Sequence, residues 1–109
     1  MANISESFTF PCGITIKNRI VKAAMAEWLC HPRKGNPNPL LEKLYTYWVE
    51  VGSGMLISGH VMIDRVMKAS TRDPVLDEKS NLESFKSYAK AATKNNTKCI
   101  LQINHPGRQ

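Results

Sequence analysis

Three short apolar runs, separated by two segments of helical periodicity, constrain the fold of this chain more than any other feature. The runs occupy residues 20–25, 55–58 and 99–103, and the segments between them predict helices at 39–51 and 81–94. Short apolar runs of this kind are typical of strands buried in a parallel sheet. The order strand, helix, strand, helix, strand is that of repeated βαβ units, so the sequence predicts an α/β fold.

Capping residues and apolar spacing define the two predicted helices. Asn38 is expected to cap the first helix, with Pro39 at its first position and Gly52 at its end. The apolar face of this helix is expected to comprise Leu40, Leu44, Trp48 and Val51. Ser80 and Glu83 form the capping-box pattern that starts the second helix. The apolar stripe of the second helix is expected to comprise Leu82, Phe85, Ala89 and Ala92.

A β-hairpin is predicted at residues 8–16, before the first strand. Residues 8–10 and 14–16 alternate in polarity around a turn that contains Gly13. We expect this hairpin to form a lid or a plug.

The segment Gly52-Ser53-Gly54 is glycine-rich, and turns of this kind bind phosphate in dinucleotide-binding folds. In those folds the turn follows the first strand and opens a helix, whereas here it follows a helix and precedes a strand. This order of elements favours a structural role for both glycines. Gly52 would end the helix, and Gly54 would allow the chain to enter a tightly packed strand.

Composition limits the class of protein. A chain of 109 residues has the usual size of one domain. Its three cysteines include no C-x-x-C pair, so the sequence indicates no disulfide framework and no metal site. The first residues lack the profile of a signal peptide, and no apolar run approaches the roughly 18 residues of a membrane span. These features predict a cytoplasmic protein with reduced thiols and no membrane partner.

The formal net charge of +6 invites a nucleic-acid interpretation. The basic residues are scattered, however, and no aromatic-basic signature of an RNA-binding module accompanies them. No specific nucleic-acid partner is therefore predicted. A solvated surface, or attraction to a phosphate-bearing ligand, explains the charge as well.

Small and polar residues stand at corresponding places after the predicted strands. Met25 and Ala26 follow the first strand, Ser58-Gly59-His60 closes the second, and Gln102 with Asn104-His105 lies at the third. In a (β/α)8 barrel the carboxyl ends of the strands carry the ligand and catalytic groups, so the placement favours a barrel. Open doubly wound sheets obey a similar rule, so the residues alone leave both architectures open.

Three sequence blocks carry a resemblance to a known family. The blocks N-R-I-V-K-A-A-M (18–25), G-M-L-I-S-G (54–59) and Q-I-N-H-P-G-R-Q (102–109) resemble the amino-terminal part of the Old Yellow Enzyme family of NAD(P)H:flavin oxidoreductases. They occur in the family's order and approximate spacing, over almost the whole chain but only about the first third of a family member. The resemblance implies a partial (β/α)8 TIM barrel, about the first three βα units preceded by the β-hairpin. Residues 1–109 would then be an amino-terminal fragment of an FMN-binding domain.

The resemblance implies an FMN-dependent NAD(P)H oxidoreductase of the ene-reductase type. Non-covalent FMN would lie across the barrel mouth, reduced by NADH or NADPH and reoxidised by a small-molecule acceptor such as an activated alkene. The cofactor contacts that it implies are Ala24, Met25, Ala26, Gly59, His60 and Gln102. The amide of Gln102 would hydrogen-bond the pyrimidine edge of the flavin, because an amide offers both a donor and an acceptor. Without the resemblance, the alternative interpretation is structural: Gln102 would be a polar residue at a strand end that hydrogen-bonds to a loop.

Two positions depart from the family pattern. Many members carry Thr or Cys after the methionine, whereas this chain has Ala26, so no hydroxyl or thiol tunes the flavin there. His60 stands where related sequences commonly have a smaller or an amide side chain. His105 and Arg108 are expected to brace the barrel mouth, and no residue is assigned as catalytic. The family's substrate-binding pair, tyrosine proton donor and phosphate-binding loops would lie beyond Gln109.

Three strands do not close an eight-stranded barrel, so this chain alone is expected to lack activity and to bind FMN weakly or not at all. The third strand would leave one unpaired edge. A second interpretation is therefore a non-catalytic barrel fragment that acts as an interaction module with a complementary chain. Self-association through the same open edge is the related expectation.

Overall fold

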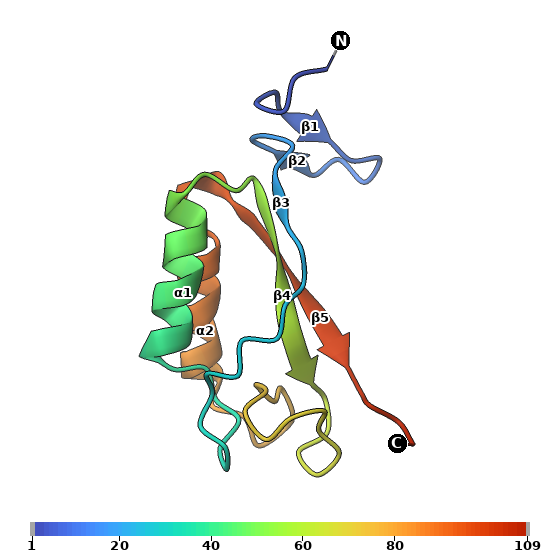
Figure 1. Cartoon of the computed structure of the whole chain (residues 1–109), viewed down its shortest axis with the longest axis vertical. Helices are drawn as coiled ribbons and strands as arrows, with labels where there is room; N and C mark the ends of the chain where they lie inside the picture. Colours follow the sequence, from blue (N-terminus) through green and yellow to red (C-terminus); the bar gives the residue numbers. More distant parts are fainter. Residues whose placement is uncertain (1, 109) are drawn as a thin grey trace.

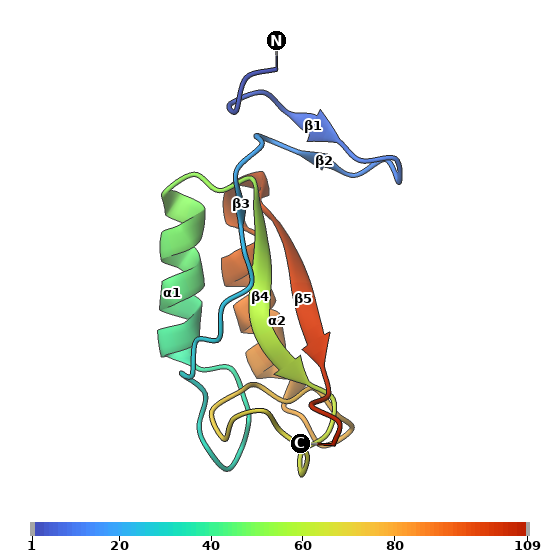
Figure 2. The same cartoon turned by 45° about the vertical axis from the view of Figure 1, so that its right-hand side comes forward.

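Two α-helices pack against one face of a three-stranded parallel sheet in the computed structural model, which describes residues 2–108 (Figure 1). The strands are β3 (Val21–Lys22), β4 (Met55–Met62) and β5 (Lys98–Asn104), and the helices are α1 (Pro39–Glu50) and α2 (Leu82–Ala92). β4 lies between the other two strands. Both helices lie on the same side of the sheet, and within the described residues the other side carries no helix (Figure 2).

The amino-terminal hairpin stands apart from this sheet. β1 (Phe8–Thr9) pairs antiparallel with β2 (Thr15–Ile16). Gly13 in the turn has φ 88°, a left-handed conformation that residues with a β-carbon rarely adopt. Figure 2 shows the hairpin near the amino end of the sheet, away from the carboxyl ends of the strands. The hairpin is therefore not a lid over the predicted site, and its role as a plug stays a prediction.

The first strand is shorter and more exposed than predicted. The apolar run at 20–25 predicts a mainly buried strand, but hydrogen-bonded pairing covers only β3. Ile20, Val21 and Met25 are 43%, 42% and 51% exposed. The reason is that β3 is an edge strand among the described residues, with a neighbour on one side only. The prediction of burial was wrong because an apolar run does not reveal how many neighbours a strand has.

The second and third strands are longer than the predicted runs. β4 extends past the predicted end at residue 58 and continues through Gly59 and His60 to Met62. A shift in pairing register between Ile57 and His60 makes this continuation possible. β5 covers the predicted run at 99–103 and one more residue at each end. A short 3-10 helix, η1 (Lys94–Asn96), joins α2 to β5.

Asparagine side chains cap both helices. Asn38 caps α1 through its Oδ1. The capping box predicted from Ser80 and Glu83 is wrong: Asn81 is the cap of α2, and its Oδ1 accepts a hydrogen bond from the N–H of Glu83 at 3.1 Å. Ser80 is engaged elsewhere, because its hydroxyl donates to the carbonyl of Val75 at 2.7 Å. Within residues 2–108, neither helix has the length and apolar content needed to cross a membrane.

The helices bury faces that differ from the predicted ones. The predicted face of α1 is mostly wrong: the residues buried are Leu41, Tyr45 and Val49, and of the predicted residues Trp48 packs partly buried against the core. The predicted stripe of α2 is half right, and the residues buried are Phe85, Tyr88, Ala91 and Ala92. Leu40, Val51 and Leu82 are 63%, 61% and 59% exposed. The packing of two tyrosines determines which helix faces are buried. The rings of Tyr45 and Tyr88 pack edge to face with their centroids 4.7 Å apart.

The hydrophobic core lies between the helices and the helix-facing side of the sheet. Tyr45 and Leu56 are completely buried there, and Val61 is 1% exposed. Burial of each such side chain stabilises the fold by about 1.5–3 kcal/mol. On the other side of the sheet Ile100 is 50% exposed. The core therefore orients β4 and β5 from one face only.

Candidate functional site

His60 and Gln102 meet at the carboxyl ends of β4 and β5. They are direct partners in the parallel ladder, so their side chains share one face of the sheet. Gln102 is half-buried, and its side-chain amide makes no hydrogen bond within residues 2–108. The amide therefore has a donor and an acceptor available at this end of the sheet, and the described residues contain no loop that uses them.

A β-bulge in β4 brings these two residues into line. Ile57 pairs with Ile100 and His60 with Gln102, so β4 contains one more residue than β5 between the two pairs. The side chain of Ser58 replaces the interrupted ladder: its Oγ accepts a hydrogen bond from the N–H of Gln102 at 2.9 Å and donates to the carbonyl of Gly59 at 2.7 Å. Bulges occur often beside active sites, where they redirect a side chain.

Glu27 holds the bulged part of β4. Its Oε1 accepts hydrogen bonds from the N–H of Gly59, at 3.0 Å, and from the hydroxyl of Tyr45. A β-carbon at position 59 would overlap Glu27 Oε2 and the carbonyl oxygen of Met25. The glycine is therefore explained by contacts inside the chain rather than by the close approach of a ligand.

Lys22 places a positive charge near the same cluster. Its Nζ lies 4.2 Å from the ring centroid of Trp48 and 5.8 Å from that of Tyr45, within the range of cation–π attraction. This Nζ is buried and has no hydrogen-bond partner within residues 2–108. Burial lowers the pKa of Lys22, and the negative charge of Glu27 opposes that shift. Burial also raises the pKa of Tyr45, so its hydroxyl keeps the proton that it donates to Glu27.

The segment after β3 carries the other predicted cofactor residues. Ala24 is half-buried, whereas Met25 and Ala26 are exposed. Trp28 follows with φ 54°, a left-handed conformation that costs about 1–2 kcal/mol for a residue with a β-carbon. The hydrogen bonds of Glu27, one residue earlier, help to hold the chain in this conformation. Met25 and Ala26 therefore lie exposed beside a fixed turn at this end of the sheet.

A second carboxylate at this end, that of Asp73, is buried. It is 2% exposed, and its Oδ2 lies 3.9 Å from His60 Nδ1. Burial raises the pKa of Asp73, and the charge of a protonated His60 opposes that shift. Asp73 Oδ2 and Asn104 Oδ1 are both buried acceptors without a hydrogen-bond partner within residues 2–108. The carboxyl ends of β4 and β5 therefore hold acceptors that the described chain leaves unused.

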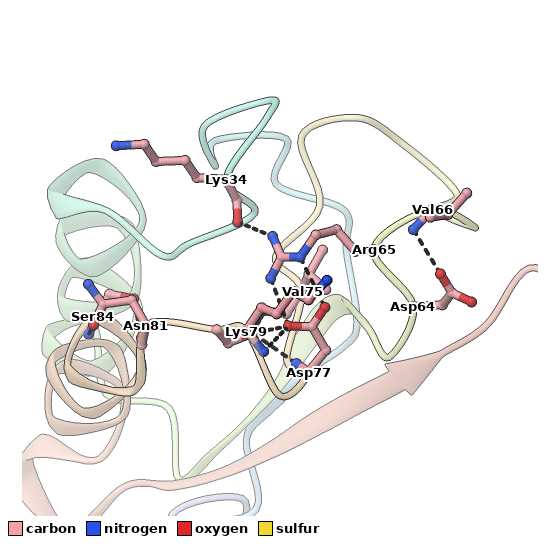
Figure 3. A network of polar contacts seen from close by, with 10 residues as sticks. Lys34, Asp64, Arg65, Val66, Val75, Asp77, Lys79, Asn81 and Ser84 are labelled. Carbon is pink, nitrogen blue, oxygen red and sulfur yellow. Dashed lines mark hydrogen bonds and ion pairs between the residues drawn. The ribbon is translucent and has the colours of Figure 1, made fainter.

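An ion pair braces the loop that follows β4 (Figure 3). Arg65 donates to Asp77 from Nε at 3.0 Å and from Nη2 at 2.7 Å, and its Nη1 donates to the carbonyl of Lys34 at 2.7 Å. This contact ties the loop before α1 to the loop before α2. The hydrogen bond from Arg65 holds the pKa of Asp77 below its ordinary value. Figure 1 shows both loops at the carboxyl end of the sheet.

His105 and Arg108 lie on the exposed segment that leaves β5. His105 Nε2 lies 3.8 Å from Asp64 Oδ2, so the histidine contacts the loop after β4. Arg108 is exposed. The position of His105 suits the bracing role expected of it, whereas the described contacts give Arg108 no defined part in the site.

Parallel βα units with half-buried polar residues at the carboxyl ends of their strands define the class of α/β proteins that includes barrels and open doubly wound sheets. The family follows from the sequence. Residues 8–109 match the profile of the NADH:flavin oxidoreductase / NADH oxidase family, and the chain belongs to this family. The resemblance to flavin oxidoreductases is thereby confirmed, and FMN and NADH are the cofactors of the family.

Curated relatives carry the same description. The chain is 33% identical, over 98% of its length, to "NADH-dependent flavin oxidoreductase iccE" of Talaromyces variabilis. It is 35% identical, over 95% of its length, to "NADH-dependent flavin oxidoreductase iliE" of a Neonectria species. It spans 27% of the first relative and 14% of the second.

Solved structures show the fold. The chain matches the old yellow enzyme homologue from Zymomonas mobilis with a TM-score of 0.84 and 20% identity, covering 98% of this chain and 29% of that one. A 2-naphthoyl-CoA reductase matches with a TM-score of 0.89 and 24% identity, over 97% of this chain and 16% of that one. The fold is therefore part of an Old Yellow Enzyme TIM barrel.

The residues present fit an FMN ring edge. A flavin pyrimidine edge offers both acceptors and an N–H donor, and the unused amide of Gln102 can pair with either kind. The orphaned acceptor of Asn104, two residues further along β5, adds a partner for the donor. Met25 and Ala26 are exposed, which leaves room for a flat ring beside them. Bound there, FMN would supply the hydride chemistry of the reaction.

Sequence reasoning missed Glu27 and Asp73. Both are isolated carboxylates outside the periodic segments, so no apolar pattern singles them out. The partner of Glu27, Gly59, is 32 residues away in the sequence. The one signal available was the glycine itself, since a glycine inside a strand often marks a bulge or a close approach.

Proposed function

We propose that this chain forms the amino-terminal part of the FMN site of a cytoplasmic NAD(P)H-dependent oxidoreductase of the ene-reductase type. The observation that carries the proposal is the pairing of His60 with Gln102 at the carboxyl ends of β4 and β5, where the amide of Gln102 is unused. Family membership supplies the cofactor and the reductant. The electron acceptor in this proposal is a small activated alkene.

Each predicted residue has one part in the proposal. The amide of Gln102 binds the pyrimidine edge of FMN and fixes the ring in its plane. The backbone of Ala24, Met25 and Ala26 lies against the ring, and the backbone of Gly59 and His60 borders it. His60 limits access to the ring from the β4 side, since its side chain is 34% exposed.

The 109 residues alone hold FMN weakly or not at all in this proposal. Three strands supply only part of a barrel interior, and a complete barrel typically has about 250 residues. Activity would therefore require the remaining βα units, whether from the same polypeptide or from another.

A segment exchange tests the proposal. Residues 8–108 replace the corresponding segment of the Talaromyces relative, and bound FMN and NADH oxidation are measured in the hybrid. We expect the hybrid to retain FMN, and Gln102→Leu to weaken FMN binding about tenfold through loss of amide hydrogen bonds. Lys90→Leu, on the exposed surface of α2, is the control and should have no effect. A hybrid that folds without FMN would refute the proposal.

A second candidate function is a non-catalytic interaction module, and the open side of the sheet favours it. On this side Ile100 is 50% exposed, and an apolar groove of about 430 Å³ runs between the hairpin and β5. A complementary chain, or a second copy, would cover this side. Sedimentation of the purified chain across a concentration series tests it: a purely monomeric chain that captures no later barrel segment would exclude this function.

A further inference from the structure

One carboxylate joins two segments that line the proposed cofactor site. Glu27 directly follows Met25 and Ala26, and its Oε1 accepts the hydrogen bond of the Gly59 N–H at 3.0 Å. Ladder pairing between β3 and β4 ends at Lys22 and its partner in β4. Beyond that pair, the side chain of Glu27 provides the connection between the two segments.

The bulge in β4 also links Glu27 to β5. Ser58, next to Gly59, accepts the hydrogen bond of the Gln102 N–H through Oγ and is 1% exposed. A displacement of Gly59 would move Ser58 and disturb this hydrogen bond. Glu27 therefore influences the position of Gln102 through two consecutive, partly buried hydrogen bonds.

The surroundings of Glu27 are fitted to a carboxylate. The buried hydroxyl of Tyr45 donates to Oε1, and a residue without a side chain at position 59 makes room for Oε2. Lys22 supplies a compensating charge without direct contact. The left-handed turn at Trp28 begins immediately afterwards, so the carboxylate lies where the chain changes direction.

We propose that Glu27 is a positioning residue, which sets the spacing between the Met25–Ala26 backbone and the Gly59–His60 backbone and thereby aligns FMN with Gln102. This inference rests on the proposed function. Glu27 does not touch the cofactor in this account, because its carboxylate is engaged by Gly59 and Tyr45. Its effect is transmitted through the backbone of β4.

The test compares three variants of the protein as isolated from its source. Glu27→Gln keeps the shape of the side chain but replaces charge-assisted hydrogen bonds with neutral ones. Tyr45→Phe removes only the hydroxyl, and it serves as the second probe should Glu27→Gln fail to fold. Glu50→Gln, at the exposed end of α1, is the matched control. The readouts are amide hydrogen exchange at Gly59, the FMN dissociation constant, and the absorption spectrum and midpoint potential of the flavin.

We expect Glu27→Gln to accelerate exchange at Gly59 and to raise the FMN dissociation constant, each about tenfold, with a shifted spectrum and potential. Tyr45→Phe should change the same quantities less, and Glu50→Gln should change none. Unaltered exchange at Gly59 would overturn the inference. So would faster exchange with an unaltered flavin spectrum, potential and affinity, since Glu27 would then be structural only. If the unmodified protein carries no FMN, the proposed function fails and the inference falls with it.

Discussion

The two sides of the β4–β5 sheet differ although alternate residues of the same strands form them. On the helix-facing side Leu56 is completely buried under α1 and α2, whereas on the other side Ile100 is 50% exposed. A βαβ unit covers one side of its sheet with its own helices. The inner side of a barrel is filled instead by layers of side chains from alternate strands around the ring. Local sequence therefore builds the first side, and the second requires strands from the rest of a barrel.

The largest effect should come from comparing the two sides directly. Leu56→Ala in the 109-residue chain should lower the free energy of unfolding by about 2–5 kcal/mol, because it opens a cavity in the core. Ile100→Ala should change it by about 0.5 kcal/mol or less, because this side chain is half-exposed. Urea denaturation of both variants measures the difference. Equal losses would mean that the two sides are equally packed, against this account.

A substitution at the bulge tests how tightly β4 packs against Glu27 at the candidate site. Gly59→Ala should cost about 1–3 kcal/mol, because the new methyl group overlaps Glu27 Oε2 and the Met25 carbonyl. Gly107→Ala is a matched control, since a β-carbon there meets no neighbouring atom within 4 Å, although its φ of 65° adds strain of its own. Thermal unfolding should show the larger loss at Gly59. A neutral Gly59→Ala would remove the basis for the contact between Glu27 and the bulge.

The helix layer offers a smaller test. Asn81→Ala should destabilise the protein by about 1 kcal/mol, because Oδ1 of Asn81 caps the first N–H groups of α2. Leu82→Ala, one residue further on and 59% exposed, should have little effect. Circular dichroism during urea titration provides the measurement. Should Leu82→Ala prove the more costly change, the face assigned to α2 would be wrong.

The smallest predicted effect concerns pH. The hydrogen bond from Arg65 holds the pKa of Asp77 below its ordinary value of 3.8. Because the folded-state pKa is the lower one, this contact stabilises the fold above about pH 4, and the contribution is lost as the pH falls through the folded-state pKa. Asp77→Asn should therefore flatten the acid side of the stability profile. Glu78→Gln is the control, and an identical profile for Asp77→Asn would contradict the prediction.

The order of elements could be predicted from the sequence because the apolar runs and the helical spacing are local signals. The face of α1 could not, since Leu40 and Leu41 begin stripes with the same spacing and only the packing of Tyr45 decides between them. Local pattern likewise placed the cap of α2 one residue too early. Among the site residues, His60 and Gln102 were predicted, and the structure pairs them. Glu27 was missed because its partners come from distant parts of the chain.

The central claim is that the carboxyl ends of β3, β4 and β5 form part of an FMN site that the rest of a barrel completes. The most direct measurement isolates the protein from its source under native conditions, determines the mass of its polypeptides and counts the FMN released on heating. The account predicts one FMN for each complete set of barrel strands, on one polypeptide or on complementary ones. Protein of that size without flavin, or 109-residue chains that hold FMN tightly on their own, would contradict it.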